Sequence, residues 1–148
     1  MLYYHTMTSD RKRDDNCIFC KIVSGEISTN KVYEDAHSYA FLDLEPIREG
    51  HTLVIPKNHH DYAENMPDDE YSAMMLTVKK LKKLYKNLFN VPQVGFFISG
   101  WDVPHTHVHV VPMKDSKDIT SKPILDKTAP KFTEIEFAKT VEKITQAL

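Results

Sequence analysis

The sequence is poor in cysteine, carries little net charge and contains no long apolar run. Its only cysteines, Cys17 and Cys20, do not resemble the disulfide framework of a secreted protein, so a reducing, cytoplasmic setting is expected. No apolar stretch approaches the ~20 residues that cross a bilayer, and residues 1–16 lack the apolar segment of a signal peptide. The net charge of −2 gives no argument for a nucleic-acid or membrane partner, and we expect neither.

The size and composition of the chain fit one globular domain. With 148 residues, of which 41% are apolar, the chain can bury one hydrophobic core but hardly two. The polar and charged N-terminus predicts a flexible tail over residues 1–16. We therefore expect a single domain over residues 17–148.

Hydrophobic periodicity predicts five strands and two long helices. Alternating or β-branched runs predict the strands, and apolar residues at steps of three and four predict the helices. Short connections favour antiparallel pairing, so the expected fold is an α+β domain with a mostly antiparallel five-stranded sheet, one long central helix and a C-terminal helix. The strands are expected at residues 31–34, 38–42, 51–55, 94–99 and 105–112, and the helices at residues 68–89 and 134–147.

The most informative stretch is residues 105–112, in which three histidines recur at every second position. A strand alternates its faces, so His105, His107 and His109 are expected on one side of the sheet. Such a row can be a solvated strand face, a source of zinc ligands, or a site where the central imidazole attacks an electrophile. The solvated face is the weakest interpretation, because Lys, Thr or Glu would serve there equally well.

The pair Cys17 and Cys20 forms a Cys-x-x-Cys motif, which is typical of a redox pair or of half a zinc site. A redox pair requires a preceding strand in a thioredoxin-like unit, and here only a charged tail precedes it. The two-residue spacing lets both thiolates reach one tetrahedral ion, provided that two further ligands come from elsewhere in the chain. The histidines are the available candidates.

The histidine-rich stretch resembles the signature of the histidine triad nucleotide hydrolases, His-φ-His-φ-His-φ-φ, where φ is apolar. Thr106 is a small departure, and His109 favours the hydrolase branch over the transferase branch, which usually has Gln there. The resemblance covers residues 17–112. Within this range the matching stretches are residues 17–27, 32–35, 41–43 and 50–57.

The resemblance implies an enzymatic mechanism. His107 would attack the α-phosphorus of a nucleotide derivative and form a nucleotidyl-histidine, which water then hydrolyses. His109 would bind the phosphate oxygens and assist the leaving group, and His51 would help to orient the triad. The implied function is hydrolysis of purine nucleoside phosphoramidates or dinucleoside polyphosphates. Two alternatives stay open: a nucleotide-binding or interaction module with weak catalysis and a structural zinc, and a zinc enzyme in which the triad itself binds the metal.

The same resemblance implies how the substrate would be held. Asp43 would accept hydrogen bonds from the two ribose hydroxyls. Ser99 stands where the family usually has Asn, on a connection to Pro104 that is shorter than usual, which leaves the leaving-group preference open. The apolar slot for the nucleoside would consist of Phe19, Ile22, Ile27, Phe41 and Leu44.

In the zinc-bearing branch of the family, a Cys-x-x-Cys joins two histidines around one ion. The corresponding residues here are Cys17, Cys20, His59 and His105, with the adjacent His60 as a rival to His59. Four protein ligands leave no open position, so the zinc would be structural. The family also tends to pair through its long helix and fourth strand, which implies a homodimer.

Overall fold

The computed structural model describes residues 11–120 and 130–148. Its sheet contains β1 (Lys31–Glu34), β2 (Ser38–Leu42), β3 (Thr52–Pro56), β4 (Gln93–Phe97) and β5 (Val108–Met113). The helices are α1 (Ile18–Val23), α2 (Asp68–Leu88) and α4 (Glu134–Ala147), and two short 3-10 helices are η1 (Ala63–Asn65) and η2 (Asp118–Thr120).

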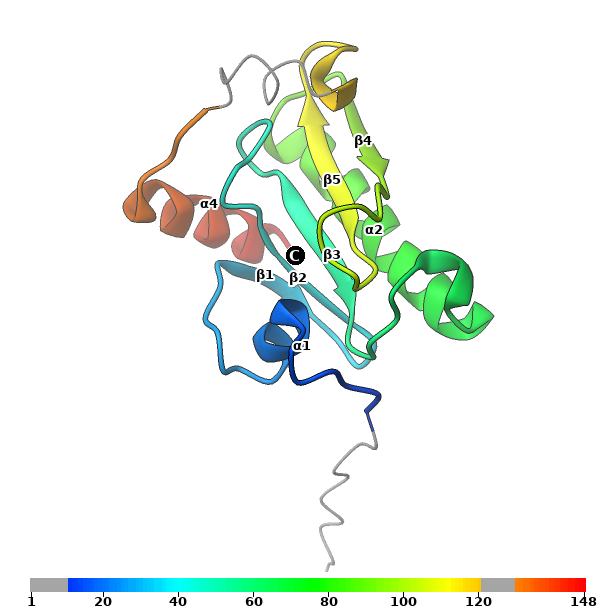
Figure 1. Cartoon of the computed structure of the whole chain (residues 1–148). Helices are drawn as coiled ribbons and strands as arrows, with labels where there is room; N and C mark the ends of the chain where they lie inside the picture. The colour runs from blue at the N-terminus through cyan, green and yellow to red at the C-terminus, as the bar shows by residue number, and fades with distance from the viewer. Residues whose placement is uncertain (1–10, 121–129) are drawn as a thin grey trace, which may run out of the picture.

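The five strands form one sheet in the order β1-β2-β3-β5-β4 (Figure 1). Every neighbouring pair is antiparallel. The predicted α+β fold, with a long central helix and a C-terminal helix, is therefore confirmed. The placement of β5 between β3 and β4 makes the histidine-bearing strand an interior strand of the sheet, whose backbone is held on both sides.

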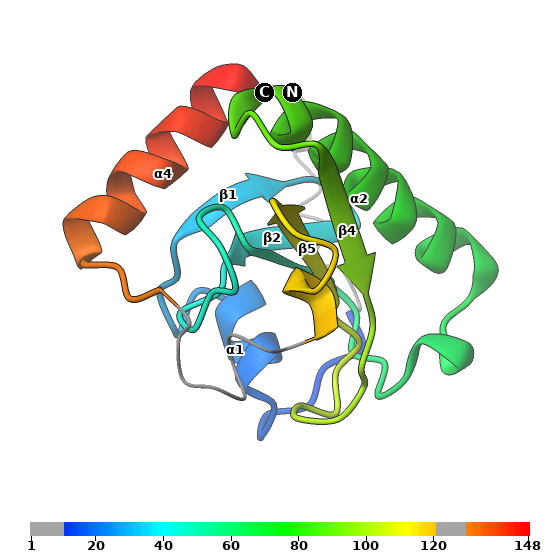
Figure 2. The same ribbon diagram turned by 90° about the horizontal axis from the view of Figure 1, so that it is seen from above.

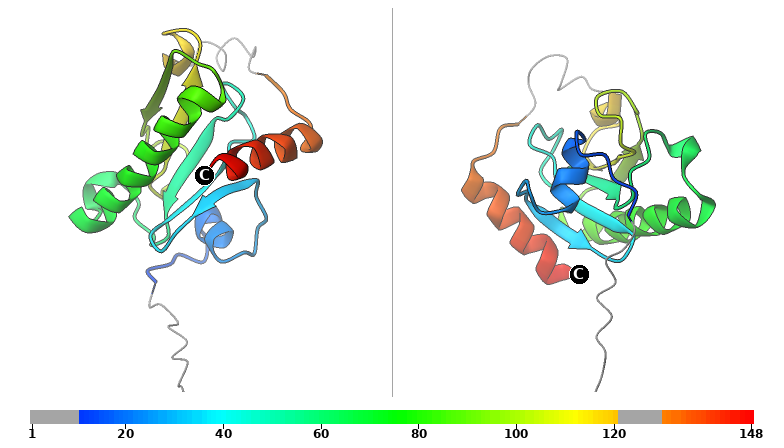
Figure 3. Two further views of the ribbon diagram at one scale, coloured as in Figure 1. Left: turned by 180° about the vertical axis from the view of Figure 1, so that it is seen from behind. Right: turned by 60° about the horizontal axis from the view of Figure 1, so that its bottom comes forward.

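Helices cover the two faces of the sheet unequally. Both α2 and α4 lie on one face, whereas the short α1 lies on the other (Figures 2 and 3). Burying the apolar stripe of each helix against the sheet is what stabilises such a layered arrangement. The core between the sheet and the two long helices includes Ala40, Val54, Val108, Val110, Leu81, Tyr85 and Ile144. A second cluster under α1 includes Phe19, Ile22, Tyr39, Phe41, Leu53 and Ile55.

Helix α4 begins at the predicted residue because Thr133 caps it. The Thr133 side chain accepts from the backbone N–H of Glu136, and the Glu136 carboxylate accepts from the backbone N–H of Thr133. This reciprocal pairing satisfies two backbone donors at the start of the helix. The negative charges of Asp68 and Asp69 in the first turn of α2 likewise stabilise that helix, because they interact favourably with the positive end of its dipole.

The strand predicted from residue 105 begins only at Val108, so this boundary is wrong by three residues. The backbone N–H and the hydroxyl of Thr106 both donate to the carbonyl of His60, at 2.7 and 3.0 Å. That carbonyl lies in a loop after β3, so residues 105–107 are held by the loop and not by the strand ladder. The histidine row therefore spans the junction between a loop and a strand.

Residues 1–10 of the predicted N-terminal tail lie outside the described residues. Within residues 11–16, the carbonyl of Lys12 accepts from the backbone N–H of His59 at 2.8 Å, and that of Asp14 accepts from Cys17 N–H at 3.1 Å. The first of these hydrogen bonds attaches this part of the N-terminus to the loop after β3, and the second forms a local turn before α1. None of the helices among the described residues combines the length and the apolar character needed to span a membrane.

Candidate active site and metal centre

Odd-numbered residues of the central strands share the face that α1 covers. The register pairs Phe41 with Leu53, Leu53 with His109, and His109 with Phe97 across four strands. Side chains alternate along a strand, so the valines on either side of His109 point into the opposite core. The predicted alternation therefore places His109 on the same face as Phe19 of α1.

His107 lies between α1 and the sheet with only one ring nitrogen engaged by the described residues. Its Nδ1 lies 2.8 Å from the His105 carbonyl oxygen, which can only accept, so Nδ1 carries the proton. Nε2 then carries the lone pair, and none of the described residues forms a hydrogen bond with it. The ring packs edge-to-face against Phe19 and His109, with centroids 5.3 and 5.2 Å away. These contacts fix the orientation of the ring and leave Nε2 without a hydrogen-bond partner among the described residues.

A short chain of hydrogen bonds fixes the proton positions of His51 and His109. The backbone N–H of Ile47 donates to His51 Nδ1 at 3.0 Å, so a neutral His51 carries its proton on Nε2. The Nε2–H group of His51 donates to His109 Nδ1, also at 3.0 Å, so a neutral His109 carries its proton on Nε2. The predicted orienting role of His51 thus has a physical basis, because it makes His109 Nε2 a hydrogen-bond donor.

Burial keeps the imidazole rings of His51 and His109 neutral. It lowers the pKa of His109 to about 3, with smaller contributions from the charges of His51 and His107. Burial also lowers the pKa of His51, against the opposing charge of Asp43. Phe97 stacks in parallel on the His109 ring with centroids 4.4 Å apart. His109 is therefore an oriented, neutral donor at pH 7 and not an imidazolium ion.

Asp43 follows β2 and lies beside the two histidines. Its Oδ1 accepts from the backbone N–H of Glu45 at 2.9 Å, and its Oδ2 lies 3.6 Å from His51 Nε2 and 3.9 Å from His109 Nδ1. These three side chains also approach the geometry of a metal site. The direct hydrogen bond between the two imidazoles already uses the nitrogen atoms that a metal would need.

A cavity of about 730 Å³ opens beside Asp43, within the usual size range of small-ligand pockets. It is lined by all five apolar residues predicted for the nucleoside slot, namely Phe19, Ile22, Ile27, Phe41 and Leu44. Ser99 follows β4 and is not among the residues that line this cavity.

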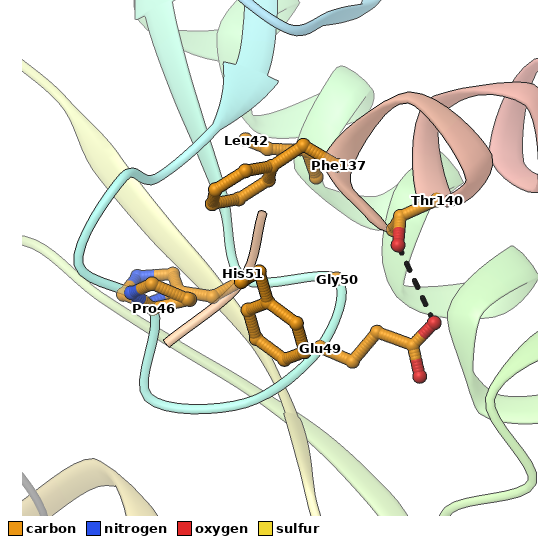
Figure 4. Close-up of a pocket in the computed structure, with 8 residues that line it drawn as sticks. Leu42, Pro46, Glu49, Gly50, His51, Phe137 and Thr140 are labelled. Atoms are coloured by element: carbon orange, nitrogen blue, oxygen red, sulfur yellow. Dashed lines mark hydrogen bonds between the residues drawn. The ribbon is translucent and has the colours of Figure 1, made fainter. Parts of the chain in front are cut away.

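The C-terminal segment completes the wall of the cavity, which the sequence analysis did not anticipate. Phe132, Glu134 and Phe137 line it from the start of α4. A small adjacent hollow shares Phe137 and lies between α4 and the loop that carries His51, as Figure 4 shows. There the Thr140 hydroxyl donates to the Glu49 carboxylate at 3.4 Å (Figure 4). In the sequence, the aromatic residues Phe132 and Phe137 on either side of the cap Thr133 were the feature from which this contribution to the cavity could have been predicted.

Two cysteines and two histidines, one of which is the first histidine of the triad, form a compact buried cluster. The Sγ atoms lie 3.3 to 3.6 Å from the facing Nδ1 atoms, and all four candidate ligand atoms lie within 4.8 Å of one another. A tetrahedral zinc ion with ordinary bond lengths separates its S and N ligands by about 3.5 Å. The donor set therefore fits zinc. Its members are Cys17, Cys20, His59 and His105.

Outer hydrogen bonds direct the histidine lone pairs toward the sulfur atoms. His105 Nε2 donates to the Pro56 carbonyl at 3.0 Å, and His59 Nε2 donates to the Asp61 carboxylate at 2.8 Å. Such a hydrogen bond from the far ring nitrogen is characteristic of metal-binding imidazoles, because it fixes Nδ1 as the ligand atom. The rival His60 instead binds Glu70 through Nε2 at 2.7 Å. Burial raises the pKa of Cys20 to about 11 in the absence of a cation.

Comparisons with known proteins agree with this geometry. The family model "HIT domain" matches residues 24–116. A protein of Candida albicans named adenosine 5'-monophosphoramidase is 43% identical over 109 residues, covering 68% of this chain and 72% of the relative. An uncharacterized HIT-like protein of Methanocaldococcus jannaschii is 46% identical over 100 residues, covering 65% of this chain and 78% of the relative.

Solved structures share the same architecture. A HIT-like protein from Bartonella henselae superposes with a TM-score of 0.76 at 26% identity, covering 92% of this chain and 99% of that chain. A zinc-bound histidine triad family protein from Mycobacterium smegmatis has a TM-score of 0.72 at 25% identity, covering 89% of this chain and 92% of that chain. The family model, the relatives and the ordered row of imidazoles lead to one conclusion: the chain belongs to the HIT family.

Proposed function

We propose that the protein hydrolyses nucleotide derivatives at the α-phosphate through a covalent intermediate on His107. The observation that carries the proposal is that Nε2 of His107 has no hydrogen-bond partner among residues 11–120 and 130–148, while the Nδ1 hydrogen bond to the His105 carbonyl places the lone pair on Nε2. The Candida relative is named an adenosine 5'-monophosphoramidase, and so are relatives from Saccharomyces cerevisiae and Schizosaccharomyces pombe. An adenosine 5'-phosphoramidate is therefore the first substrate to test, and dinucleoside polyphosphates are the second.

In the proposed reaction, Nε2 of His107 attacks the α-phosphorus, and the bond from phosphorus to the leaving group breaks as the bond from phosphorus to Nε2 forms. The leaving group takes up a proton from solvent, so that ammonia departs from an adenosine phosphoramidate. Water then attacks the same phosphorus, returns a proton to solvent, releases the nucleoside monophosphate and restores the lone pair on His107 Nε2. Covalent catalysis divides one difficult displacement into two easier ones. A neutral imidazole suits the first step because it needs no prior deprotonation at pH 7.

His109 acts in this proposal as a donor to the phosphate oxygens and the leaving group. Its Nε2–H is left available by the hydrogen bond between His51 and Nδ1 of His109. Because the low pKa of His109 keeps the ring neutral, it stabilises charge through a hydrogen bond and does not serve as a proton source. His51 acts through His109 and has no contact with substrate in this scheme.

The nucleoside would occupy the cavity beside β2, with its ribose next to Asp43. Phe19 and Phe41 supply apolar walls, and Phe132 closes the cavity from the C-terminal segment. One oxygen of Asp43 is already bound by the backbone N–H of Glu45, which holds the carboxylate in place. The second oxygen faces His51 and His109 at 3.6 and 3.9 Å, beyond hydrogen-bond distance, and would accept from a sugar hydroxyl.

Replacing Asp43 by Ala is expected to raise KM for an adenosine phosphoramidate about tenfold, because a hydrogen bond to a charged group contributes roughly 1.5–3 kcal/mol. For the 2'-deoxyadenosine substrate, KM should rise much less on the same substitution, since this sugar offers one hydroxyl fewer to Asp43. Steady-state kinetics on both sugars measure the difference. Glu45→Gln is the control, because Glu45 contributes only its backbone to this contact. Equal effects on both sugars would contradict the role.

A structural zinc in the Cys17, Cys20, His59 and His105 cluster is part of the proposal. When bound, the ion would join the N-terminal segment to the histidine row. His107 and His109 do not belong to this cluster, which favours a structural ion over a metal that binds substrate. The carbonyl of His105 holds His107 Nδ1, so the metal would support the nucleophile indirectly.

The alternative function is nucleotide binding with little turnover. It is motivated by the residues 99–104, which depart from the family pattern and carry Trp101 with 88% of its surface exposed. The deciding experiment incubates the purified protein with adenosine 5'-phosphoramidate and, separately, titrates it with adenosine monophosphate in a calorimeter. Ready release of adenosine monophosphate supports the hydrolase, whereas tight binding without release supports the alternative.

We also propose that two chains pair through β4 and α2. As the last strand in the sheet order, β4 has one edge without a strand partner among the described residues. Phe96 of β4 is 42% exposed, and Leu76 of the neighbouring α2 is 64% exposed. Unprotected sheet edges with apolar neighbours favour association. Light scattering on the eluted chromatographic peak should give the mass of two chains, and the mass of one chain would refute the dimer.

A further inference from the structure

Arg48 and Asp118 form an ion pair that joins two segments far apart in the sequence. Arg48 donates through Nε to Asp118 Oδ2 at 2.9 Å and through Nη2 to Oδ1 at 2.8 Å. The Asp118 side chain is 4% exposed and the Arg48 side chain 36%. A bidentate guanidinium–carboxylate contact fixes both distance and orientation, which a single flexible contact does not.

On one side, the ion pair is attached to the end of β5. Asp118 Oδ2 also accepts from the backbone N–H groups of Lys114 and Asp115, at 2.8 and 3.0 Å. Lys114 directly follows the strand that carries His109. Burial alone would raise the pKa of the Asp118 carboxyl. The Arg48 guanidinium and the two backbone hydrogen bonds outweigh burial and hold this pKa below its ordinary value. The group is therefore an anion at neutral pH.

On the other side, the ion pair is attached to the residues that hold His51. The Arg48 carbonyl accepts from the backbone N–H of His51 at 3.0 Å. The adjacent Ile47 donates its N–H to His51 Nδ1, also at 3.0 Å. Arg48 thus lies in the short loop whose backbone fixes both the main chain and the proton position of His51.

We propose that Arg48 and Asp118 are positioning residues, whose ion pair holds the His51 loop against the end of β5 and so sets the hydrogen bond between His51 and His109. The catalytic consequence rests on the function proposed above, in which His109 donates to the phosphate. Asp118 lies beyond the residues that the family model matches, 24–116. A displacement of about 1 Å in such a donor can cost on the order of a hundredfold in rate, so a loop that shifts by less than this would still lower kcat.

The test compares Arg48→Gln, Arg48→Lys and Asp118→Asn with the parent protein. Asn at position 118 keeps an oxygen for the two backbone N–H groups and loses only the charge-assisted pairing. Asp35→Asn is the matched control, because Asp35 also accepts two backbone N–H bonds, from His37 and Ser38 at the β1–β2 turn. Two readouts are used: kcat and KM on adenosine 5'-phosphoramidate, and the nitrogen chemical shifts of the imidazole rings by NMR.

In Arg48→Gln and Asp118→Asn, kcat is expected to fall about tenfold with KM within twofold, and Arg48→Lys should recover part of the loss. The kcat of the double variant should be no lower than that of the more impaired single variant, because both substitutions break the same contact. The ring nitrogens of His51 should change from a single Nε2–H tautomer to a mixture. In Asp35→Asn, both kcat and the tautomer should stay as in the parent.

Unchanged kcat and unchanged His51 nitrogen shifts in Arg48→Gln would overturn the proposal, and so would an equal loss of kcat in Asp35→Asn. If the parent protein shows no turnover, the proposed function fails, but the imidazole shifts still decide the positioning role. A tautomer change in the Arg48 and Asp118 variants then supports it, and an unchanged tautomer overturns it.

Discussion

Replacing His107 by Ala is expected to lower kcat/KM on adenosine 5'-phosphoramidate by about four orders of magnitude or more. Loss of the nucleophile in covalent hydrolysis typically costs this much, because the remaining groups bind and polarise the substrate but cannot form the intermediate. The ring of His107 contacts Phe19 and His109 and lies outside the metal cluster, so its removal leaves the rest of the site in place. Chromatography of released adenosine monophosphate measures the rate.

Two further measurements separate loss of chemistry from loss of binding. Calorimetric affinity for adenosine monophosphate should change only a few-fold in the His107→Ala protein, because the cavity beside Asp43 is untouched. Acid quenching of the parent protein during turnover should reveal a nucleotidyl adduct by intact mass, and the variant should show none. His37→Ala serves as control, since His37 is exposed at the β1–β2 turn. Turnover at the parent rate in the His107 variant would refute the mechanism.

Removal of zinc is expected to have the second largest effect, this time on stability. The purified protein should contain one zinc per chain, and chelation should lower its melting temperature by more than ten degrees. Structural zinc sites bind with apparent free energies of about 10 kcal/mol or more, comparable with the whole stability of a small domain. The four buried ligand atoms would also lose the ion that satisfies them. Calorimetric melts with and without chelator give the shift.

Single substitutions identify the ligands. Cys20→Ser should lose the metal and melt at the temperature of the chelated parent protein. His60→Ala is the matched control, because His60 is buried nearby but its Nε2 is bound to Glu70. It should retain one zinc per chain. A parent protein without zinc, or a melting temperature that chelation does not change, would contradict the structural site.

The parts of the fold that the sequence predicted well are those with a local physical cause. Strands β1 and β2 occupy the predicted residues because the turn between them is closed by Asp35, whose carboxylate accepts from two backbone N–H groups. Helix α4 begins where Thr133 forms a capping box. Turn and cap chemistry act over three or four residues, so a sequence shows them directly.

The parts that the sequence did not predict depend on contacts between distant segments. Strand β5 starts later than predicted because Thr106 donates hydrogen bonds to the carbonyl of His60, 46 positions away. The C-terminal wall of the cavity requires α4 to pack beside the loop that carries His51, which no periodicity encodes. The role of Asp118 depends in the same way on Arg48, 70 positions away. Local patterns identified the histidines, whereas only the folded chain shows what orients them.

The alternation of the two faces also determines which changes the chain tolerates. His109 lies between the core valines Val108 and Val110 in β5, so one inserted residue within the strand would turn His109 into the packing under α2 and send a valine toward the substrate. The connection of residues 98–104, which precedes the first histidine of the row, carries no such constraint, because a loop absorbs an extra residue without changing the phase of a strand. Divergence in length between relatives should therefore accumulate in that connection, while the strand keeps its length unchanged.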